Sequence, residues 1–360
     1  MKKENELVLE LCKFTEPNRE RIQELLHEIS DYPSVLGQLL FNRVGAAAYY
    51  TLRECELLGH VNREFRNSLK AMFDVGVDKA ASFERCLYTV SSILDRVNYK
   101  YAFLKGAYLY SAYPKGLRTS NDIDILLERD SLNDICNLLK SSGFAQGSIR
   151  NGKFVPASRM EIIDSMMNRG ETVPFIKKVD LPKMEFCEID LNYSLDYKPV
   201  QDSAIISEFL ERSRPVNGIM TFSQIDFLIH LCIHLYKEAT IMSWVDMQRD
   251  LSLYKFCDIY LLIHKWMDAD FAVQLEERIK KYGLEKECYH ALYYTRLLFD
   301  IKNESLDKLL SNIKPKDTSF LKEVFDPEKG KIYKHKKSLL DWFFSSDRKR
   351  YLYEITNEKA

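Results

Sequence analysis

Two aspartates separated by one isoleucine, Asp122 and Asp124, constrain the fold of this chain more than any other feature of its 360 residues. They lie in the run Asp-Ile-Asp-Ile. Side chains of a β-strand alternate between its two faces, so both carboxylates would project from one face and both isoleucines from the other. Two carboxylates on one strand face repel each other, and burial would raise their pKa values. A divalent cation between them would remove this conflict, and Mg²⁺ prefers carboxylate and phosphate oxygens. The pattern alone is also typical of a solvated strand end.

The residues before this run predict a short strand, a tight turn and a helix. Residues 99–104 are mostly apolar and indicate a strand that ends at Lys105 and Gly106. Residues 107–113 then indicate a short helix, which Pro114 would end. A loop with basic and hydroxyl side chains leads from there directly into the acidic strand. The unit therefore combines a lysine, a glycine turn and two carboxylates within one short stretch of chain.

This order of features resembles the nucleotidyltransferase superfamily, whose palm is of the DNA polymerase β type. The resemblance rests on Leu-Lys-Gly at 104–106, on Arg118 and Ser120, and on Asp-Ile-Asp-Ile-Leu at 122–126. It fits a bacterial group in which Leu-Lys-Gly replaces the usual Gly-Ser turn. The chain departs from the superfamily pattern in two ways, since Ala107 stands where the phosphate-binding serine would be and the spacer before the acidic strand is longer. The resemblance implies an α+β fold, in which a small mixed-sheet palm is flanked by N- and C-terminal helical domains.

The resemblance also implies a reaction. The protein would transfer a nucleoside monophosphate from an NTP, with ATP expected, to an acceptor hydroxyl or phosphate, and would release pyrophosphate. Asp122, Asp124 and a third acid would be the catalytic residues and the ligands of two Mg²⁺ ions. Superfamily members place the third acid on a later hairpin strand, and residues 184–195 alternate well enough to be that strand. Asp190 is the candidate, with Glu188 on the same face as the alternative.

Four further residues are expected to contact the nucleotide: Lys105, Gly106, Arg118 and Ser120. Lys105 would offer its charge to the triphosphate in place of the absent serine, and Gly106 would let the backbone approach closely. Arg118 and Ser120 border the same position and would add phosphate contacts. The alternative for the three polar residues is an ordinary surface position beside the strand end.

Helical periodicity dominates both ends of the chain. Apolar residues recur at spacings of three and four through residues 1–97, which predicts a helical N-terminal region. Residues 98–198 would form the palm, with a less regular stretch after Gly143, and residues 199–360 would form a helical C-terminal domain. These three ranges are the predicted domains.

Composition sets limits on the class of protein. The hydrophobic share of 46% and the charged share of 29% are typical of a globular protein. The net charge of −1 gives no global field that would attract nucleic acid or anionic lipid. Eight cysteines are scattered without any C-x-x-C pair, which favours a reducing cytoplasm over disulfides or zinc. No signal peptide is expected, so a cytoplasmic bacterial enzyme that is not inserted in a membrane is predicted.

Three functions fit these observations. The first is an Mg²⁺-dependent nucleotidyltransferase that modifies a small molecule, peptide or protein. The second is an RNA or tRNA nucleotidyltransferase of the toxin type, which would need a continuous basic surface. The basic residues among aromatics at 329–350 could supply one, although flanking acids favour a solvated helix face there. The third is a non-catalytic protein of the same fold that binds a nucleotide or a partner. The three candidate acids argue against this last function, because a scaffold does not require close carboxylates.

Overall fold

A computed structural model describes residues 1–195 and 203–355, and the chain divides into two compact units. One unit contains Met72–His230 and the other combines Met1–Ala71 with Leu231–Ala360. Both divisions fall inside continuous helices, α5 (Arg63–Leu94) and α10 (Gln224–Thr240). The predicted domain boundaries after residues 97 and 198 stay a prediction.

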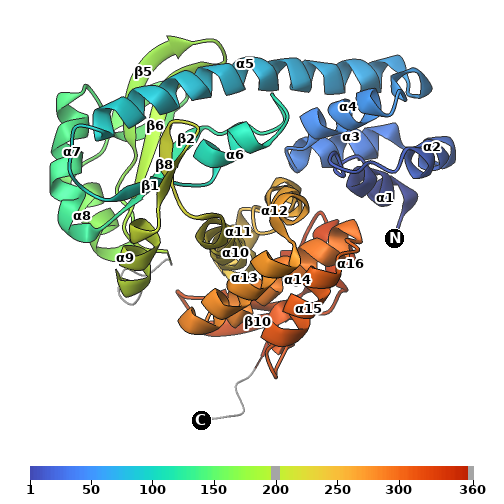
Figure 1. The fold of residues 1–360 in the computed structure, drawn as a ribbon. Coiled ribbons are helices and arrows are strands. Elements are labelled where there is room, and N and C mark those ends of the chain that lie inside the picture. Colours follow the sequence, from blue (N-terminus) through green and yellow to red (C-terminus); the bar gives the residue numbers. More distant parts are fainter. Residues whose placement is uncertain (196–202, 356–360) are drawn as a thin grey trace. The chain divides into compact units, whose positions relative to one another are not determined.

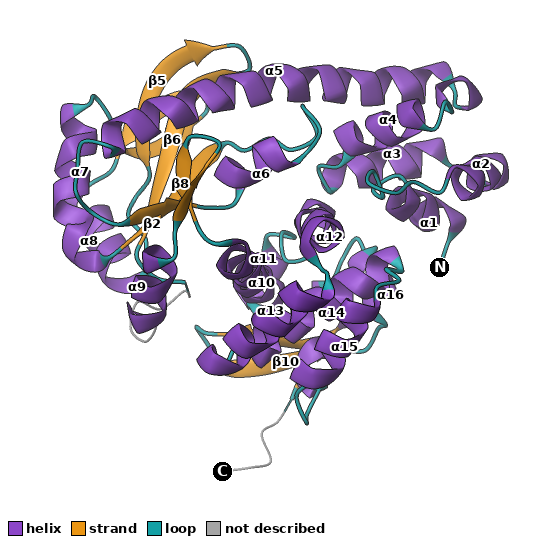
Figure 2. Ribbon diagram, viewed as in Figure 1, coloured by secondary structure: helices purple, strands orange, loops and turns teal. Residues whose placement is uncertain are grey.

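The unit Met72–His230 is built on one eight-stranded sheet (Figures 1 and 2). Its strands are β1 (Tyr101–Phe103), β2 (Asp122–Leu127), β3 (Ala145–Arg150), β4 (Lys153–Pro156), β5 (Phe175–Leu181), β6 (Met184–Asn192), β7 (Arg214–Val216) and β8 (Ile219–Thr221). They are ordered β4-β3-β5-β6-β2-β1-β8-β7. β2 runs parallel to β6 and β1 parallel to β8, whereas all other neighbours are antiparallel. The mixed sheet confirms the predicted α+β class.

Two hairpins of this sheet differ from the sequence-based expectation. The chain after Gly143 was expected to be irregular but forms β3 and β4, and β7 and β8 form beyond residue 198, where helix was expected. β4 contains Pro156 and β7 contains Pro215, and both strands are at the edges of the sheet. Proline has no N–H to donate to a strand ladder, but it is tolerated in edge strands. These two short edge strands also lack the apolar alternation that indicates a central strand.

Helices pack against the face of the sheet that carries the isoleucines of β2. The helices of this unit, besides its parts of α5 and α10, are α6 (Gly106–Ala112), α7 (Leu132–Ser141), α8 (Arg159–Asn168) and α9 (Ser203–Glu211). Phe83 and Leu87 of α5 and Ile135 of α7 belong to one buried cluster with Ile123 and Ile125 of β2. Figure 2 shows α5 crossing the strands. Because the isoleucines of β2 face this core, its aspartates project from the opposite face.

The second unit is mainly helical, as predicted for both ends of the chain. Its helices, besides its parts of α5 and α10, are α1 (Lys3–Glu10), α2 (Arg19–Glu28), α3 (Tyr32–Phe41), α4 (Gly45–Glu54), α11 (Met242–Asp246), α12 (Leu253–Trp266), α13 (Ala269–Tyr282), α14 (Glu285–Phe299), α15 (Glu304–Ile313) and α16 (Leu339–Phe343), with 3₁₀ turns at Leu58–His60, Ser319–Lys322 and Lys349–Tyr351. A three-stranded sheet of β9 (Glu323–Asp326), β10 (Lys331–His335) and β11 (Leu352–Glu354) completes it. Among the described residues, no helix is long and apolar enough to cross a membrane.

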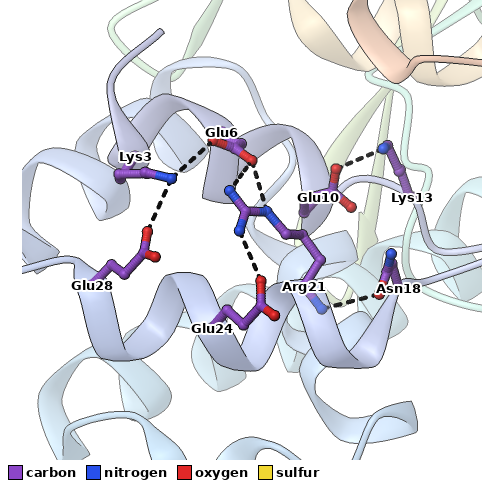
Figure 3. A network of polar contacts seen from close by, with 8 residues as sticks. All are labelled: Lys3, Glu6, Glu10, Lys13, Asn18, Arg21, Glu24 and Glu28. Atoms are coloured by element: carbon purple, nitrogen blue, oxygen red, sulfur yellow. Dashed lines mark hydrogen bonds and ion pairs between the residues drawn. The ribbon is translucent and has the colours of Figure 1, made fainter.

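Charged side chains join α1 to α2 at the start of the chain (Figure 3). Arg21 of α2 donates from Nε to Glu6 Oε1 of α1 over 2.8 Å, and from Nη1 to Glu24 Oε2 over 2.8 Å. Lys3 Nζ lies 3.0 Å from Glu28 Oε2. Arg21 thus bridges the two helices in addition to its pair within α2. Water screens ion pairs between exposed side chains, so this network adds little to the stability of the unit.

The basic tail forms β10 and its neighbours, not the helix face that was expected. Lys331 Nζ lies 2.9 Å from Glu354 Oε1 across the β10–β11 ladder, and Lys334 Nζ lies 3.1 Å from Glu323 Oε1 across the β10–β9 ladder. Cross-strand pairs of opposite charge stabilise a sheet surface. The lysines of β10 are therefore matched by acids on both neighbouring strands.

Candidate active site

The pairing of β2 with β6 gathers four carboxylates on one sheet face. The two strands are parallel, and their register sets Asp122 beside Glu188 and Asp124 beside Asp190. Residues two apart on a strand share a face, and directly paired residues of neighbouring strands point to the same side. The structure therefore brings together the three predicted metal ligands, and it places the alternative acid Glu188 next to Asp122.

Lys105 and Ser120 also reach these acids. Lys105 Nζ lies 2.7 Å from Asp124 Oδ1, and Asp124 is only 5% exposed. Ser120 Oγ donates to Asp122 Oδ1 over 2.7 Å. Both residues were predicted to contact a nucleotide, and the structure shows that each contacts one of the strand aspartates. Arg118, the fourth predicted nucleotide ligand, makes a local contact, since its Nη1 donates to the carbonyl oxygen of Thr119 over 2.6 Å.

The backbone at Lys105 is held in an uncommon conformation. Its φ of 44° and ψ of −115° are in a region that favours glycine, and a residue with a side chain is strained there. The flanking hydrogen bonds fix the turn, because the Leu104 N–H donates to the Asp124 carbonyl and the Leu109 N–H donates to the Lys105 carbonyl. The turn between β1 and α6 thus directs the Lys105 side chain toward β2.

Gly106 leaves room for Ser120. A Cβ atom added to Gly106 would lie 2.6 Å from Ser120 Cβ and 2.7 Å from Ser120 Oγ, which is far closer than such atoms approach. The sequence predicted that Gly106 allows close approach of the backbone to a phosphate. The structure gives a further reason for glycine, since a side chain here would displace the serine that donates to Asp122.

Gly106→Ala is expected to lower the free energy of unfolding by about 1–3 kcal/mol, the usual cost of overpacking. It should also weaken nucleotide binding, because Ser120 must shift. Urea denaturation and nucleotide titration measure the two effects. Gly37→Ala in α3 is the matched control, since a Cβ atom there would meet nothing within 4 Å and alanine favours a helix by up to about 1 kcal/mol. Equal stability of Gly106→Ala and the wild type would contradict the steric argument.

The acids are electrostatically in conflict. Burial raises the pKa of Asp190 well above its usual value, and the charges of Asp124 and Asp122 raise it further. Burial likewise raises the pKa of Asp124, although Lys105 opposes that shift. Burial and Asp122 raise the pKa of Glu188. Burial would lower the pKa of the Lys105 ammonium, but the carboxylates, first of all Asp124, outweigh it and raise that pKa. One ammonium thus partly compensates a group of acids of which Asp124 is buried and the others are partly buried.

Glu171 is a further acid at this face that the sequence did not indicate. It forms an isolated antiparallel bridge with Asn192, two residues after Asp190 on the same face of β6. Its charge contributes to the raised pKa of Asp124. In the sequence it is a single acid after Gly170, with no motif around it, so only the non-local bridge reveals its position.

The donor chemistry of this face fits a hard divalent cation. Asp190 Oδ1 is buried and has no hydrogen-bond partner among the described residues, and a buried carboxylate oxygen is stabilised by such a partner or by a metal ion. Carboxylates are the ligands that Mg²⁺ prefers. Within the described parts of the chain, no three His, Cys, Asp or Glu side chains already stand in the arrangement of a metal site. Lys105 is the cationic partner of Asp124 in this arrangement.

Comparison with known proteins identifies the family of the chain. The profile of a family described as uncharacterised nucleotidyltransferase matches residues 30–300. The chain belongs to this nucleotidyltransferase family. The resemblance that the sequence motifs carried is thereby confirmed at the level of family. The match includes the β2 and β6 acids and Lys105.

Solved structures and curated proteins give two further comparisons for this member of the nucleotidyltransferase family. A solved structure, the crystal structure of an antigenic nucleotidyltransferase-like protein from Paracoccidioides brasiliensis, is similar over 58% of this chain and 93% of that chain, with 15% sequence identity and a TM-score of 0.34. Comparison with curated proteins gives no match.

Proposed function

We propose that the protein is an Mg²⁺-dependent nucleotidyltransferase that moves a nucleoside monophosphate from an NTP, with ATP expected, to an acceptor hydroxyl or phosphate. The observation that carries this proposal is the register of β2 and β6. It sets Asp124 beside Asp190 and Asp122 beside Glu188, with Lys105 on Asp124. Close acids that are buried or partly buried are unfavourable in a protein that has no cation to bind, so their grouping supports catalysis over a purely structural role.

The reaction is a substitution at the α-phosphorus. The acceptor oxygen forms a bond to that phosphorus, the bond to the oxygen that bridges to the β-phosphate breaks, and pyrophosphate leaves with the bonding electrons. When bound, Mg²⁺ would neutralise charge on the phosphates and lower the pKa of the acceptor hydroxyl. Asp122 and Asp124 would hold it together with Asp190.

Asp190 is the residue that we assign to accept the acceptor's proton. It stands in register beside Asp124, on the face where the cation and the acceptor would meet, and a positioned carboxylate can take up a proton in the transition state. Ser120 keeps Asp122 oriented through the 2.7 Å hydrogen bond, and Lys105 would offer its charge to the triphosphate.

A small molecule, peptide or protein is the acceptor class that we favour over RNA. Lys331 and Lys334 of the basic tail each pair with an acid of a neighbouring strand. Lys329 Nζ likewise lies 3.0 Å from Asp326 Oδ2. Matched charges of this kind give little attraction for a phosphate backbone.

Incubation with radiolabelled NTPs, Mg²⁺ and a cell extract tests the function. We expect label from α-³²P-NTP on an acceptor and none from γ-³²P-NTP, because the γ-phosphate leaves in pyrophosphate. Label on RNA, protein or small molecules identifies the acceptor class, and Asp122→Asn serves as the inactive control. Normal nucleotide binding without label in any extract would instead indicate a non-catalytic nucleotide-binding protein.

A further inference from the structure

Lys105 is a cation that the protein already supplies to the acidic face. Its ammonium lies 2.7 Å from Asp124 Oδ1, and its side chain is 21% exposed against 7% for that of Asp124. Four carboxylates stand in register on β2 and β6, and three of them, Asp124, Asp122 and Asp190, act electrostatically on Lys105. A buried carboxylate in such a group needs a cation nearby, and Lys105 provides one before any divalent ion binds.

The same contact opposes the binding of a divalent ion to Asp124. An ammonium at hydrogen-bond distance from Asp124 Oδ1 repels a second cation at that oxygen and occupies part of its coordination space. Asp190 Oδ1, by contrast, is buried, and no described residue forms a hydrogen bond with it. The described residues contain no set of three side chains already arranged as a metal site. The acids are therefore present, but Asp124 is engaged by Lys105.

Lys105 can leave Asp124 without disturbing the fold. The strained turn fixes its backbone, through the hydrogen bonds from Leu104 to Asp124 and from Leu109 to Lys105. The ammonium stands at the end of four rotatable methylene groups, so it can move while the Cα atom stays in place. A triphosphate is a stronger partner for an ammonium than one carboxylate, since it carries several negative charges.

We propose that Lys105 is a positioning residue that couples the binding of the divalent cation to the binding of the nucleotide. It competes with the divalent cation for Asp124, and the triphosphate draws it away, so that cation and nucleotide each strengthen the binding of the other. This inference rests on the proposed nucleotidyltransferase function. Such coupling is reciprocal, and its usual size corresponds to a change in affinity of about 5- to 150-fold.

Binding of Mn²⁺ alone tests the competition. Free Mn²⁺ is measured by electron paramagnetic resonance in a titration of the whole protein without nucleotide. We expect Lys105→Gln and Lys105→Met to bind Mn²⁺ about 10-fold more tightly than the wild type, within the usual range of such coupling. Lys105→Arg keeps the charge and should remain close to the wild type. Lys178→Met on β5 is the matched control, because Lys178 is exposed and pairs with Asp180 at 3.4 Å.

Binding of α,β-methylene ATP in EDTA tests whether the triphosphate draws Lys105 away from Asp124. Asp124→Asn releases Lys105, so this variant should bind the analogue more tightly than the wild type. That gain should be lost in the double variant Asp124→Asn/Lys105→Gln, which separates the effect of Lys105 from the loss of one negative charge. This measurement also stands if the single lysine variants fold poorly.

The outcomes distinguish a failure of this inference from a failure of the proposed nucleotidyltransferase function. Unchanged Mn²⁺ affinity in both uncharged Lys105 variants, together with loss of Mn²⁺ binding in Asp124→Asn, overturns the competition but leaves the nucleotidyltransferase proposal in place. An equal gain in nucleotide affinity with and without Lys105 overturns it as well. A wild-type protein that binds neither Mn²⁺ nor α,β-methylene ATP contradicts the proposed function, and the inference fails with it.

Discussion

Asp122→Asn and Asp124→Asn are each expected to lower the rate of nucleotide transfer by about 10³-fold or more, since each removes a carboxylate that would hold Mg²⁺ at the reacting phosphate. Both aspartates share one face of β2, and each stands beside another acid of β6. An asparagine keeps the shape of the side chain but cannot carry the charge that a cation requires. Initial rates of label transfer from α-³²P-NTP measure the effect.

The stability of these two variants should differ. The repulsion between the two acids by itself predicts an unchanged or raised melting temperature for both variants. Asp124, however, is the partner of Lys105. Asp124→Asn therefore removes one unfavourable negative charge but also weakens the interaction that Lys105 makes. We therefore expect a raised melting temperature for Asp122→Asn and little change in melting temperature for Asp124→Asn. Glu185→Gln, on the exposed start of β6, is the control for both rate and stability. A double variant that transfers nucleotide at the wild-type rate would end the assignment of these acids.

Local pattern was sufficient to predict the strands that carry the acids. The alternation around Asp122 and Asp124 predicted β2, and the alternation of residues 184–195 predicted β6, with Asp190 on its polar face. Strand period is a property of consecutive residues, so it can be read from sequence. The Leu-Lys-Gly turn likewise indicated the break between β1 and α6.

The contacts between distant segments could not be predicted in this way. The parallel register of β2 and β6, the bridge of Glu171 to Asn192, and the addition of β7 and β8 to β1 all join residues far apart in the sequence. Register is set by the packing of whole faces and not by any single strand. The pairing of Lys105 with Asp124 follows from the same topology. For this reason the sequence assigned Lys105 only to the triphosphate and did not reveal its contact with the acid.

Asp190→Asn is expected to stabilise the protein by an amount that grows with pH. Because burial and neighbouring acids raise the folded-state pKa of Asp190, it lies above the unfolded value of about 3.9. The stability that the protonated carboxyl contributes is therefore fully present below about pH 4 and is lost as the pH rises through the folded-state pKa. Asparagine is neutral throughout, so the variant and the wild type should be similar near pH 4. At pH 8 the variant should be more stable by about 1–3 kcal/mol, the usual cost of a buried polar group without a partner.

Urea denaturation followed by circular dichroism between pH 4 and pH 9 measures this difference, with Glu185→Gln on the same strand as the control. A constant difference at all pH values would mean that Asp190 is not a buried acid in conflict with its neighbours. Mg²⁺ provides the second comparison. If Asp190 is a ligand, Mg²⁺ should raise the stability of the wild type most at high pH, where the carboxylate is charged, and should affect Asp190→Asn far less. The destabilising charge of the free protein and the affinity for the cation are then two consequences of one feature, the grouping of acids on a face that Lys105 only partly neutralises.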